Sequence, residues 1–507
     1  MKRFNKAATD SSGGQPTTAG DHRNDVVAGV LGANAVSVVL RDPPLDVLWT
    51  VVGARNLDHR VRKAILPEDD LAQPVQMPKD KILGDILPTG FDEESCLSRY
   101  QSLLYRRGVP RKASPHLISK LRSYEALHKK CGPYTALYNK TMEDLKSGRY
   151  SSISDYLFCE PFPDVSWLLP LDFPLTNKFN GFNWKSPESY GNLLKSNSLG
   201  NLSGSAPQPY VYLHLVHDYD DHDKLFFCDQ DQSYLQKIPW LIMKTDNYFI
   251  PSLFLIHSFE QELHNLFPDK ETVFHLLGRY LFHPTNSVWG LISRYYEAYL
   301  SKADVKVGIQ IRVFDTETGP FKHVLDQILS CTMKEGILPQ INEQEPIINP
   351  SGKQKTVSVL MTSLSGGYFE ELRDLYWEHP TVTGDVIEVY QPSHEGHQQT
   401  EKQNHNRKAW AEMYLLSLTD KLVTSSWSTF GYVAQGLGNL KPWILYKPEN
   451  RTAPDPPCRR AVSMEPCFHA PPFYDCKLRR GVDTGALVPH VKHCEDMSWG
   501  LKLVEPM

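Results

Sequence analysis

Residues 305–314 read VKVGIQIRVF, and this stretch is the strongest indication of the fold class. Apolar residues occupy every second position, which is the period of a strand with one buried face. These residues are Val305, Val307, Ile309, Ile311 and Val313. Gln310 and Arg312 lie on the opposite face, with Arg312 near the carboxyl end of the predicted strand.

Arg312 is a candidate phosphate-binding residue. In open α/β sheets ligands bind beside the carboxyl ends of the strands, and a guanidinium can hold a phosphate through two parallel hydrogen bonds. An isolated arginine at a strand end more often forms an ordinary salt bridge. The choice between the two therefore depends on the elements that follow.

Strand and helix patterns alternate after this stretch. Five strands alternate with four helices over roughly 140 residues, which predicts a parallel, doubly wound sheet. The N-terminal half shows no comparably complete alternation. Strands are predicted there at residues 210–216, 224–227 and 240–244. In the C-terminal half the predicted strands are 305–314, 356–362, 386–391, 421–425 and 442–446, and the helices 321–334, 368–378, 404–418 and 428–436.

Length and charge limit the kinds of protein to be considered. The chain has 507 residues, of which 41% are hydrophobic, so we expect a globular protein of two or three domains. The formal net charge of -5 argues against nucleic acid as the main partner, because nucleic-acid-binding proteins carry a strongly basic surface. Phosphate chemistry must then depend on a few placed basic residues.

The cysteines and sequons favour the lumen of the secretory pathway. None of the nine cysteines forms a CxxC pair, so a zinc ribbon or a thioredoxin motif is not expected. The four cysteines after residue 450 lie in a Pro-rich segment that disulfides would stabilise. N-glycosylation sequons begin at Asn139, Asn201 and Asn450.

No segment has the pattern of a membrane anchor or a signal peptide. Residues 26–40 are the most apolar candidate, but they span only fifteen residues and include Gly29, Gly32 and Asn34. A transmembrane helix needs about 20 mostly apolar residues. Residues 1–25 are polar, unlike a signal peptide.

A second informative stretch is residues 421–438, KLVTSSWSTFGYVAQGLG. A short apolar strand leads into hydroxyl residues, after which a helix begins. Backbone N–H groups at a helix start form an anion site, although serines at this place also simply cap helices. With Arg312 on another strand of the same sheet, this stretch predicts a site for a nucleotide diphosphate that needs no metal. The hydroxyl residues are Ser425, Ser426, Ser428 and Thr429.

Two polar motifs resemble metal-binding sites only weakly. Residues 217–223, HDYDDHD, resemble a DxD metal site, but a solvated acidic loop is the favoured interpretation. His394, Glu395 and His397 lack the spacing of HExxH, so no zinc site is expected.

Aromatic residues near strand ends are also candidates. Tyr390 ends a predicted strand, and the loop that begins there is expected beside the nucleotide. Tyr368 and Phe369 could stack on guanine or pack into the core, and the sequence does not decide between these.

Long motifs carry a resemblance to a known family. They include VGIQIRVF, LSGGYFEELRDLYWEHP, VYQPSHEGHQQ and TSSWSTFGYVAQGLGNLKPWILYKPEN, the last followed by DPPC. From about Gly90 to the C-terminus the chain resembles the plant cell-wall fucosyltransferases of glycosyltransferase family 37, which include xyloglucan fucosyltransferase.

The resemblance implies an α/β, GT-B-like fold with two Rossmann-like domains. It implies metal-independent, inverting transfer of L-fucose from GDP-fucose to a galactose or other sugar hydroxyl of cell-wall polysaccharide or glycoprotein glycans. Arg312 would neutralise the leaving diphosphate, and Asp246 would position or deprotonate the acceptor hydroxyl. The expected donor-binding residues are Gln310, Arg312, Tyr390, Ser425, Ser426, Ser428, Thr429 and Phe430.

One departure from the family pattern concerns the N-terminal domain. The family carries a strand and a GLGNR turn there, whereas residues 146–156, KSGRYSSISDY, run directly into the FCEPFP segment. The N-terminal domain is therefore expected to be incomplete. The alternative function is a catalytically impaired member that binds a GDP-sugar or a partner glycosyltransferase.

The resemblance also implies a place in the cell and a domain organisation. It indicates the Golgi lumen, with a homodimer or a complex with other Golgi glycosyltransferases as candidate assemblies, although the family's type II membrane anchor is not visible. We expect a variable, poorly ordered region at 1–80, an acceptor-side domain at 81–303, a GDP-fucose-binding domain at 304–450 and a Cys/Pro-rich segment at 451–507.

Overall fold

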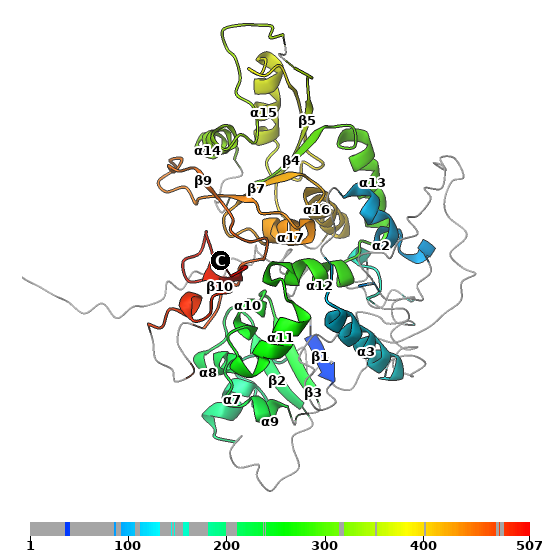
Figure 1. Cartoon of the computed structure of the whole chain (residues 1–507), viewed down its shortest axis with the longest axis vertical. Coiled ribbons are helices and arrows are strands. Elements are labelled where there is room, and N and C mark those ends of the chain that lie inside the picture. The colour runs from blue at the N-terminus through cyan, green and yellow to red at the C-terminus, as the bar shows by residue number, and fades with distance from the viewer. Residues whose placement is uncertain are drawn as a thin grey trace, which may run out of the picture.

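The chain folds into two α/β units, each built on its own sheet (Figure 1). The computed structural model describes residues 36–40, 86–87, 93–106, 112–131, 143, 147, 156–161, 181–198, 210–236, 238, 240–313, 319–349, 352–399, 402–472, 476 and 481–506. Side chains are described there except at 36–40, 127–131 and 240. The sequons at Asn139 and Asn201, most of the predicted region 1–80 and most of the break predicted at 146–156 lie outside these residues.

The larger sheet has six strands in the order β6-β5-β4-β7-β8-β9. The five predicted strands are confirmed, and β4 to β8 run parallel. A sixth strand, β9, pairs antiparallel with β8 at the edge. The bounds are β4 (Val305–Gln310), β5 (Thr356–Thr362), β6 (Val386–Tyr390), β7 (Lys421–Ser425), β8 (Trp443–Leu445) and β9 (Cys458–Arg460).

Helices cover both faces of this sheet, as the alternation predicts. One face packs its apolar side chains against α14 (Lys322–Lys334) and α15 (Gly367–Glu378). The other packs against α13 (Asn286–Tyr299), α16 (Gln403–Leu416) and α17 (Thr429–Gly438).

Gly308 explains how one helix approaches the sheet. A Cβ at this position would lie 2.9 Å from Leu416 Cδ2 and 3.0 Å from Thr419 Oγ1, so a side chain there would displace the end of α16. At Gly308 this face of β4 is therefore covered by the end of α16 and the residues after it.

The smaller sheet has three strands in the order β1-β3-β2. β2 (Tyr210–Leu215) and β3 (Trp240–Thr245) are parallel, as in a Rossmann-like unit, and β1 (Val36–Leu40) pairs antiparallel with β3. β1 comes from the region for which no regular structure was expected. An apolar, β-branched run such as VSVVL favours a strand once an edge is available to pair with it.

The prediction of a strand at residues 224–227 is wrong. This stretch ends α8 (Asp221–Lys224) and continues as the 3-10 helix η6 (Leu225–Phe227). Asp220 caps the start of α8 and accepts from the backbone N–H groups of His222 and Asp223. Such a capping box stabilises a helix against the extended conformation that the aromatic residues favour.

Short helices complete the N-terminal unit. They are η3 (Glu93–Ser95), α2 (Leu97–Gln101), η4 (Ser102–Tyr105), α3 (Pro115–Cys131), α7 (Tyr190–Lys195), α9 (Gln232–Leu235), α10 (Ile250–Leu253), η7 (His257–Phe259), α11 (Glu260–Leu266), η8 (Lys270–Thr272) and α12 (Val273–Leu281). No helix in the described parts of the chain is long and apolar enough to span a membrane.

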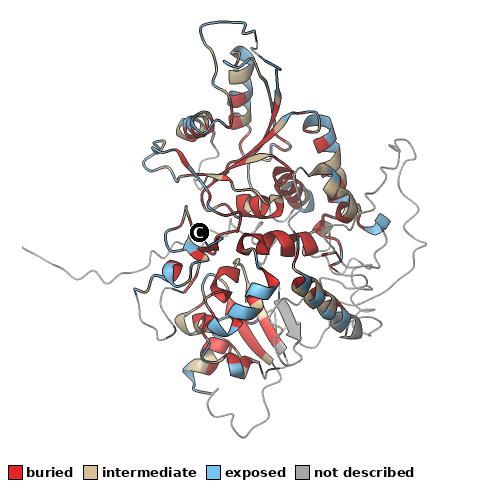
Figure 2. Ribbon diagram, in the orientation of Figure 1, coloured by how far each residue is buried: buried red, intermediate tan, exposed pale blue. Residues whose placement is uncertain are grey.

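Helix α12 lies between the two units and is almost completely buried (Figure 2). It packs on α17 through glycines, because a Cβ at Gly436 would lie 2.3 Å from Phe274 Cδ1. His275 Nδ1 lies 3.1 Å from the Gly436 carbonyl oxygen, and Arg279 donates to the Tyr414 hydroxyl at 2.7 Å. These contacts join the two units closely.

The segment after β9 returns to the N-terminal unit. Its strands β10 (Val491–His493) and β11 (Leu501–Leu503) form a hairpin whose side chains, with Phe468, complete the N-terminal core. The expected disulfides of this segment are confirmed. The four disulfides of the described residues are Cys96–Cys159, Cys228–Cys476, Cys331–Cys458 and Cys467–Cys494.

Candidate functional site

A cavity of about 310 Å³ lies at the carboxyl edge of the larger sheet. Its walls come from the loops that follow β4, β5 and β6, where an open α/β sheet binds its ligand. Nearly half of these wall residues are glycines, so backbone lies close to the space. The lining residues are Gly319, Leu364, Ser365, Gly366, His394, Gly396 and His397.

Arg312 lies at the same edge, two residues after the end of β4. Its backbone N–H donates to Ser425 Oγ at 3.0 Å, which joins it to the last residue of β7. Its Nη2 lies 3.5 Å from Gln398 Oε1 in the loop after β6. The half-buried guanidinium therefore contacts the loop after β6, while the backbone of Arg312 is bonded to the end of β7.

Gln310, a predicted donor-binding residue, is buried within the sheet. Its Oε1 accepts from Thr424 Oγ1 at 2.7 Å, so this side chain joins β4 to β7. Gly431 of α17 makes room for the pair, since a Cβ there would lie 1.8 Å from Thr424 Oγ1 and 3.3 Å from Gln310 Oε1. Gln310 thus supports the start of α17.

The hydroxyls of Ser425 at the end of β7, and of Ser426 and Ser428 after it, all have partners within the protein. Ser425 Oγ accepts from Arg312 N, and Ser426 Oγ donates to the Leu445 carbonyl. Ser428 caps α17 by accepting from Gly431 N at 3.5 Å. These hydroxyls shape the turn, and the groups it can offer an anion are the backbone amides at the helix start.

Thr429 and Phe430 open α17 and are both half-buried. Phe430 packs against the core between the sheet and α16. The structure therefore brings Arg312, the serine turn and these first residues of α17 together at one edge.

Tyr390 lies at the end of β6, but its ring does not line the cavity. The ring lies 4.9 Å from that of Tyr299 on α13. Burial and the neighbouring Glu388 carboxylate raise the pKa of Tyr390 to about 12, so the hydroxyl stays protonated.

The two interpretations of Tyr368 and Phe369 are resolved differently. Tyr368 is buried in the core, and its hydroxyl accepts from Phe321 N at 3.0 Å. Phe369 lies 5.6 Å, ring to ring, from His394 in the cavity wall. Core packing is thus correct for Tyr368, whereas Phe369 supports a wall residue of the cavity.

Glu395 of the same loop is held by a lysine and a histidine. It accepts from Lys408 Nζ at 2.5 Å, and its Oε2 lies 3.2 Å from His405 Nδ1. The Lys408 ammonium lowers the pKa of Glu395, so its carboxylate stays charged and fixes this loop to α16.

Asp246 follows β3 directly, on the edge of the smaller sheet. Its Oδ1 accepts from His217 N at 2.9 Å, and its Oδ2 contacts His217 Nδ1. The Asp246 side chain is 16% exposed, whereas that of His217 is 73% exposed. The imidazole is thus oriented by a carboxylate while most of its surface faces solvent.

His217 was not among the candidate site residues predicted from the sequence. A usable signal existed, because β2 and β3 are parallel and the residues that follow them meet at one edge. The prediction of a solvated acidic loop at 217–223 is wrong for Asp223. Asp223 is buried and accepts from Gly191 N at 3.0 Å, and burial raises its pKa to about 6.

The architecture and this edge define a class of protein. Two α/β units, one of which has a cavity, an arginine and a helix start at the carboxyl edge of its sheet, have the architecture of a GT-B-like glycosyltransferase. A model of the xyloglucan fucosyltransferase family matches residues 60–156 and 151–477. The chain belongs to the xyloglucan fucosyltransferase family.

Individual relatives agree with this assignment. A galactoside 2-alpha-L-fucosyltransferase of Pisum sativum is 60% identical over 513 residues, 93% of this chain and 89% of that protein. One of Arabidopsis thaliana is 58% identical over 470 residues, 84% of this chain and 83% of that protein. The structure of an Arabidopsis thaliana FUT1 mutant in complex with GDP matches 84% of this chain and all of its own, at 57% identity and a TM-score of 0.73. The expected family and GT-B-like fold class are confirmed.

Proposed function

We propose that this protein transfers L-fucose from GDP-fucose to the 2-hydroxyl of a galactose residue in a cell-wall glycan, with inversion. The observation that carries the proposal is the place of Arg312. Its backbone is bonded to the end of β7, four residues before the start of α17, and its side chain contacts the loop after β6. Galactoside 2-alpha-L-fucosyltransferases at 58% and 60% identity support the choice of donor and acceptor sugar.

Positive charge at this edge would stabilise the leaving GDP. As the bond from fucose to the diphosphate breaks, negative charge grows on the phosphate oxygens. The Arg312 guanidinium and the positive end of the α17 dipole both favour that charge. We propose that these groups replace a metal ion, and that Gln310 and the serine turn hold them in place.

The acceptor hydroxyl would enter from the side of the smaller sheet. Asp246 and His217 are the titratable pair at its edge, and they would orient the galactose hydroxyl and receive its proton. Xyloglucan is the acceptor that the family name indicates, and the disulfides favour the Golgi lumen as the place of reaction.

The alternative is a catalytically impaired member that binds a GDP-sugar or a partner glycosyltransferase. The family model matches in two segments that overlap at residues 151–156, where the sequence analysis places the missing GLGNR turn. Against the alternative stands 60% identity to a named fucosyltransferase over 93% of the chain. We therefore prefer the active enzyme.

The experiment is GDP binding by the full chain, followed by fucosyl transfer to galactose-terminated xyloglucan. Arg312→Ala should weaken GDP binding by about 100-fold, because charge-assisted phosphate contacts are among the strongest hydrogen bonds. Lys322→Ala serves as the matched control, since Lys322 is an exposed cation of α14 that pairs with Asp326. Equal GDP affinity in Arg312→Ala and the wild type, measured by calorimetry, would refute the donor site.

A further inference from the structure

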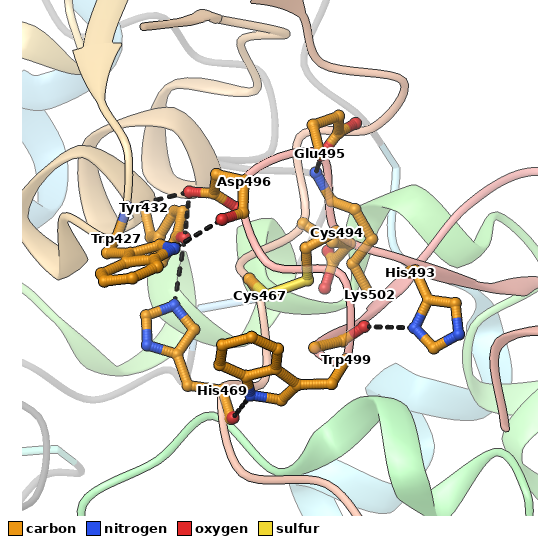
Figure 3. Close-up of a disulfide and its surroundings, with 12 residues drawn as sticks. Trp427, Tyr432, Cys467, His469, His493, Cys494, Glu495, Asp496, Trp499 and Lys502 are labelled. Carbon is orange, nitrogen blue, oxygen red and sulfur yellow. Dashed lines mark hydrogen bonds and ion pairs between the residues drawn. A yellow bond between two sulfur atoms is a disulfide. The ribbon is translucent and has the colours of Figure 1, made fainter. Parts of the chain in front are cut away.

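The turn between β7 and α17 is held by a residue 69 positions away in the sequence (Figure 3). Trp427 N donates to Asp496 Oδ2 at 2.9 Å, and the Trp427 indole donates to the Asp496 carbonyl. Tyr432 of α17 donates from its hydroxyl to the same Oδ2 at 2.5 Å. Asp496 therefore binds the turn and the first part of the helix together.

Trp427 needs such support because its backbone is left-handed, with φ of 61°. A bulky residue rarely adopts this conformation, which persists only where the surroundings impose it. Trp427 donates two hydrogen bonds to Asp496. In addition, the Lys447 ammonium lies 4.5 Å from the centroid of its indole ring. The direction in which the chain enters α17 thus depends on Trp427.

Asp496 is itself fixed by the surrounding C-terminal segment. The Cys467–Cys494 disulfide closes this segment two residues before Asp496. His469 Nε2 lies 3.1 Å from the Tyr432 hydroxyl oxygen, and Trp499 Nε1 donates to the His469 carbonyl at 3.1 Å. Figure 3 shows these side chains gathered around the disulfide.

We propose that Asp496 is a positioning residue of the donor site. By holding Trp427 in its left-handed conformation, it aims the backbone amides at the start of α17 toward the diphosphate of GDP-fucose. It acts through the turn at residues 425–428. The inference rests on the proposed function, because it assigns a role within the same donor site.

The experiment compares Asp496→Ala and Asp496→Asn with the wild-type full chain. Asp496→Ala should raise both the KM for GDP-fucose and the Kd for GDP by about tenfold or more, while the acceptor KM stays within about twofold. Asp496→Asn keeps an oxygen that accepts from Trp427 N, and should stay within about threefold of the wild type. A loss of general stability would not separate the donor KM from the acceptor KM in this way.

Glu495→Gln is the matched control. Glu495 is the neighbouring carboxylate of the same segment, but it binds Lys502 Nζ at 2.8 Å and Val462 N at 2.7 Å. This change should leave the donor KM within about twofold. Equal donor KM values in Asp496→Ala and the wild type, or equal increases in Asp496→Ala and Glu495→Gln, would overturn the inference.

A second variant tests the role of the backbone conformation itself. Glycine adopts a left-handed φ without strain, so Asp496→Ala should cost less donor affinity in a Trp427→Gly background than in the wild type. An equal cost in both backgrounds would show that Asp496 does not act through Trp427. A wild-type protein that binds no GDP would overturn the proposed function as well, whereas the other outcomes concern Asp496 alone.

Discussion

Arg312 and the serines at the end of β7 and after it have different roles at the proposed donor site. Arg312 offers a charged side chain at the sheet edge, as the sequence predicts. Ser425, Ser426 and Ser428 instead use their hydroxyls to bond Arg312 N, the Leu445 carbonyl and Gly431 N. At this edge the side chains of the serines therefore build the turn, whereas the charge of Arg312 is the basis of the proposed donor site.

The proposed role of Asp246 can be tested by a single substitution. Asp246→Asn should lower kcat by about 100-fold or more, because a positioned proton acceptor contributes roughly that factor. GDP binding should stay within about twofold, since Asp246 lies on the edge of the other sheet. Transfer kinetics and calorimetry on the full chain measure both quantities.

Asp218→Asn is the control for that change. Asp218 lies in the loop that carries His217, but it binds His214 Nε2 at 2.8 Å and its side chain is 49% exposed. This variant should keep a kcat close to that of the wild type. A wild-type kcat in Asp246→Asn would remove the carboxylate from the mechanism.

At the scale of elements, parallel pairing decides which residues meet. β4 and β7 are neighbours, so Arg312 and Ser425 reach the same edge although 113 positions separate them. β2 and β3 are neighbours, so the residues that follow them, His217 and Asp246, also meet. Both pairs of residues thus meet at the carboxyl ends of parallel strands.

The packing of α12 on α17 gives a prediction about stability. Gly436→Ala should lower the free energy of unfolding by about 1–3 kcal/mol, because a Cβ at this position would lie 2.3 Å from Phe274 Cδ1 in a filled interface. Gly352→Ala is the matched control, since a Cβ there meets nothing within 4 Å. Urea unfolding of both variants provides the comparison, and equal midpoints would contradict the close packing of these helices.

At the scale of the whole molecule, the segment after β9 joins the two units. It leaves the edge of the larger sheet, where Cys458 is bonded to Cys331 of α14, and its hairpin completes the core of the smaller unit. Cys476 is bonded to Cys228 of that unit. The turn before α17 and the core of the smaller unit are therefore held by one continuous piece of chain.

Glu465 of this segment should make the free energy of unfolding depend on pH. Its carboxyl group is buried between the units and accepts from Tyr248 OH at 2.5 Å and Phe274 N at 2.8 Å. Burial raises the pKa of Glu465 from 4.5 to about 8. Between these two pKa values the folded state therefore binds the proton more tightly than the unfolded state does. The contribution of Glu465 to the free energy of unfolding is fully present below pH 4.5 and is lost as the pH rises through about 8.

Glu465→Gln should remove this dependence. Between pH 5 and 8 the wild type should lose up to about 1.4 kcal/mol of unfolding free energy per pH unit relative to the variant. Denaturant unfolding across this range measures the difference between the two proteins. Parallel pH profiles would show that Glu465 is not a buried, protonated link between the units.

The sequence by itself determined the alternation of five strands and four helices, the place of Arg312 at a strand end and the family. Each of these depends on local periodicity or on a continuous motif, so neighbouring residues carry the information. Only the tertiary structure decided that the serine hydroxyls are bonded internally, that His217 meets Asp246 and that Asp496 holds Trp427. These contacts join residues far apart in the chain, and they form only when strand order and the return of the C-terminal segment bring their elements together.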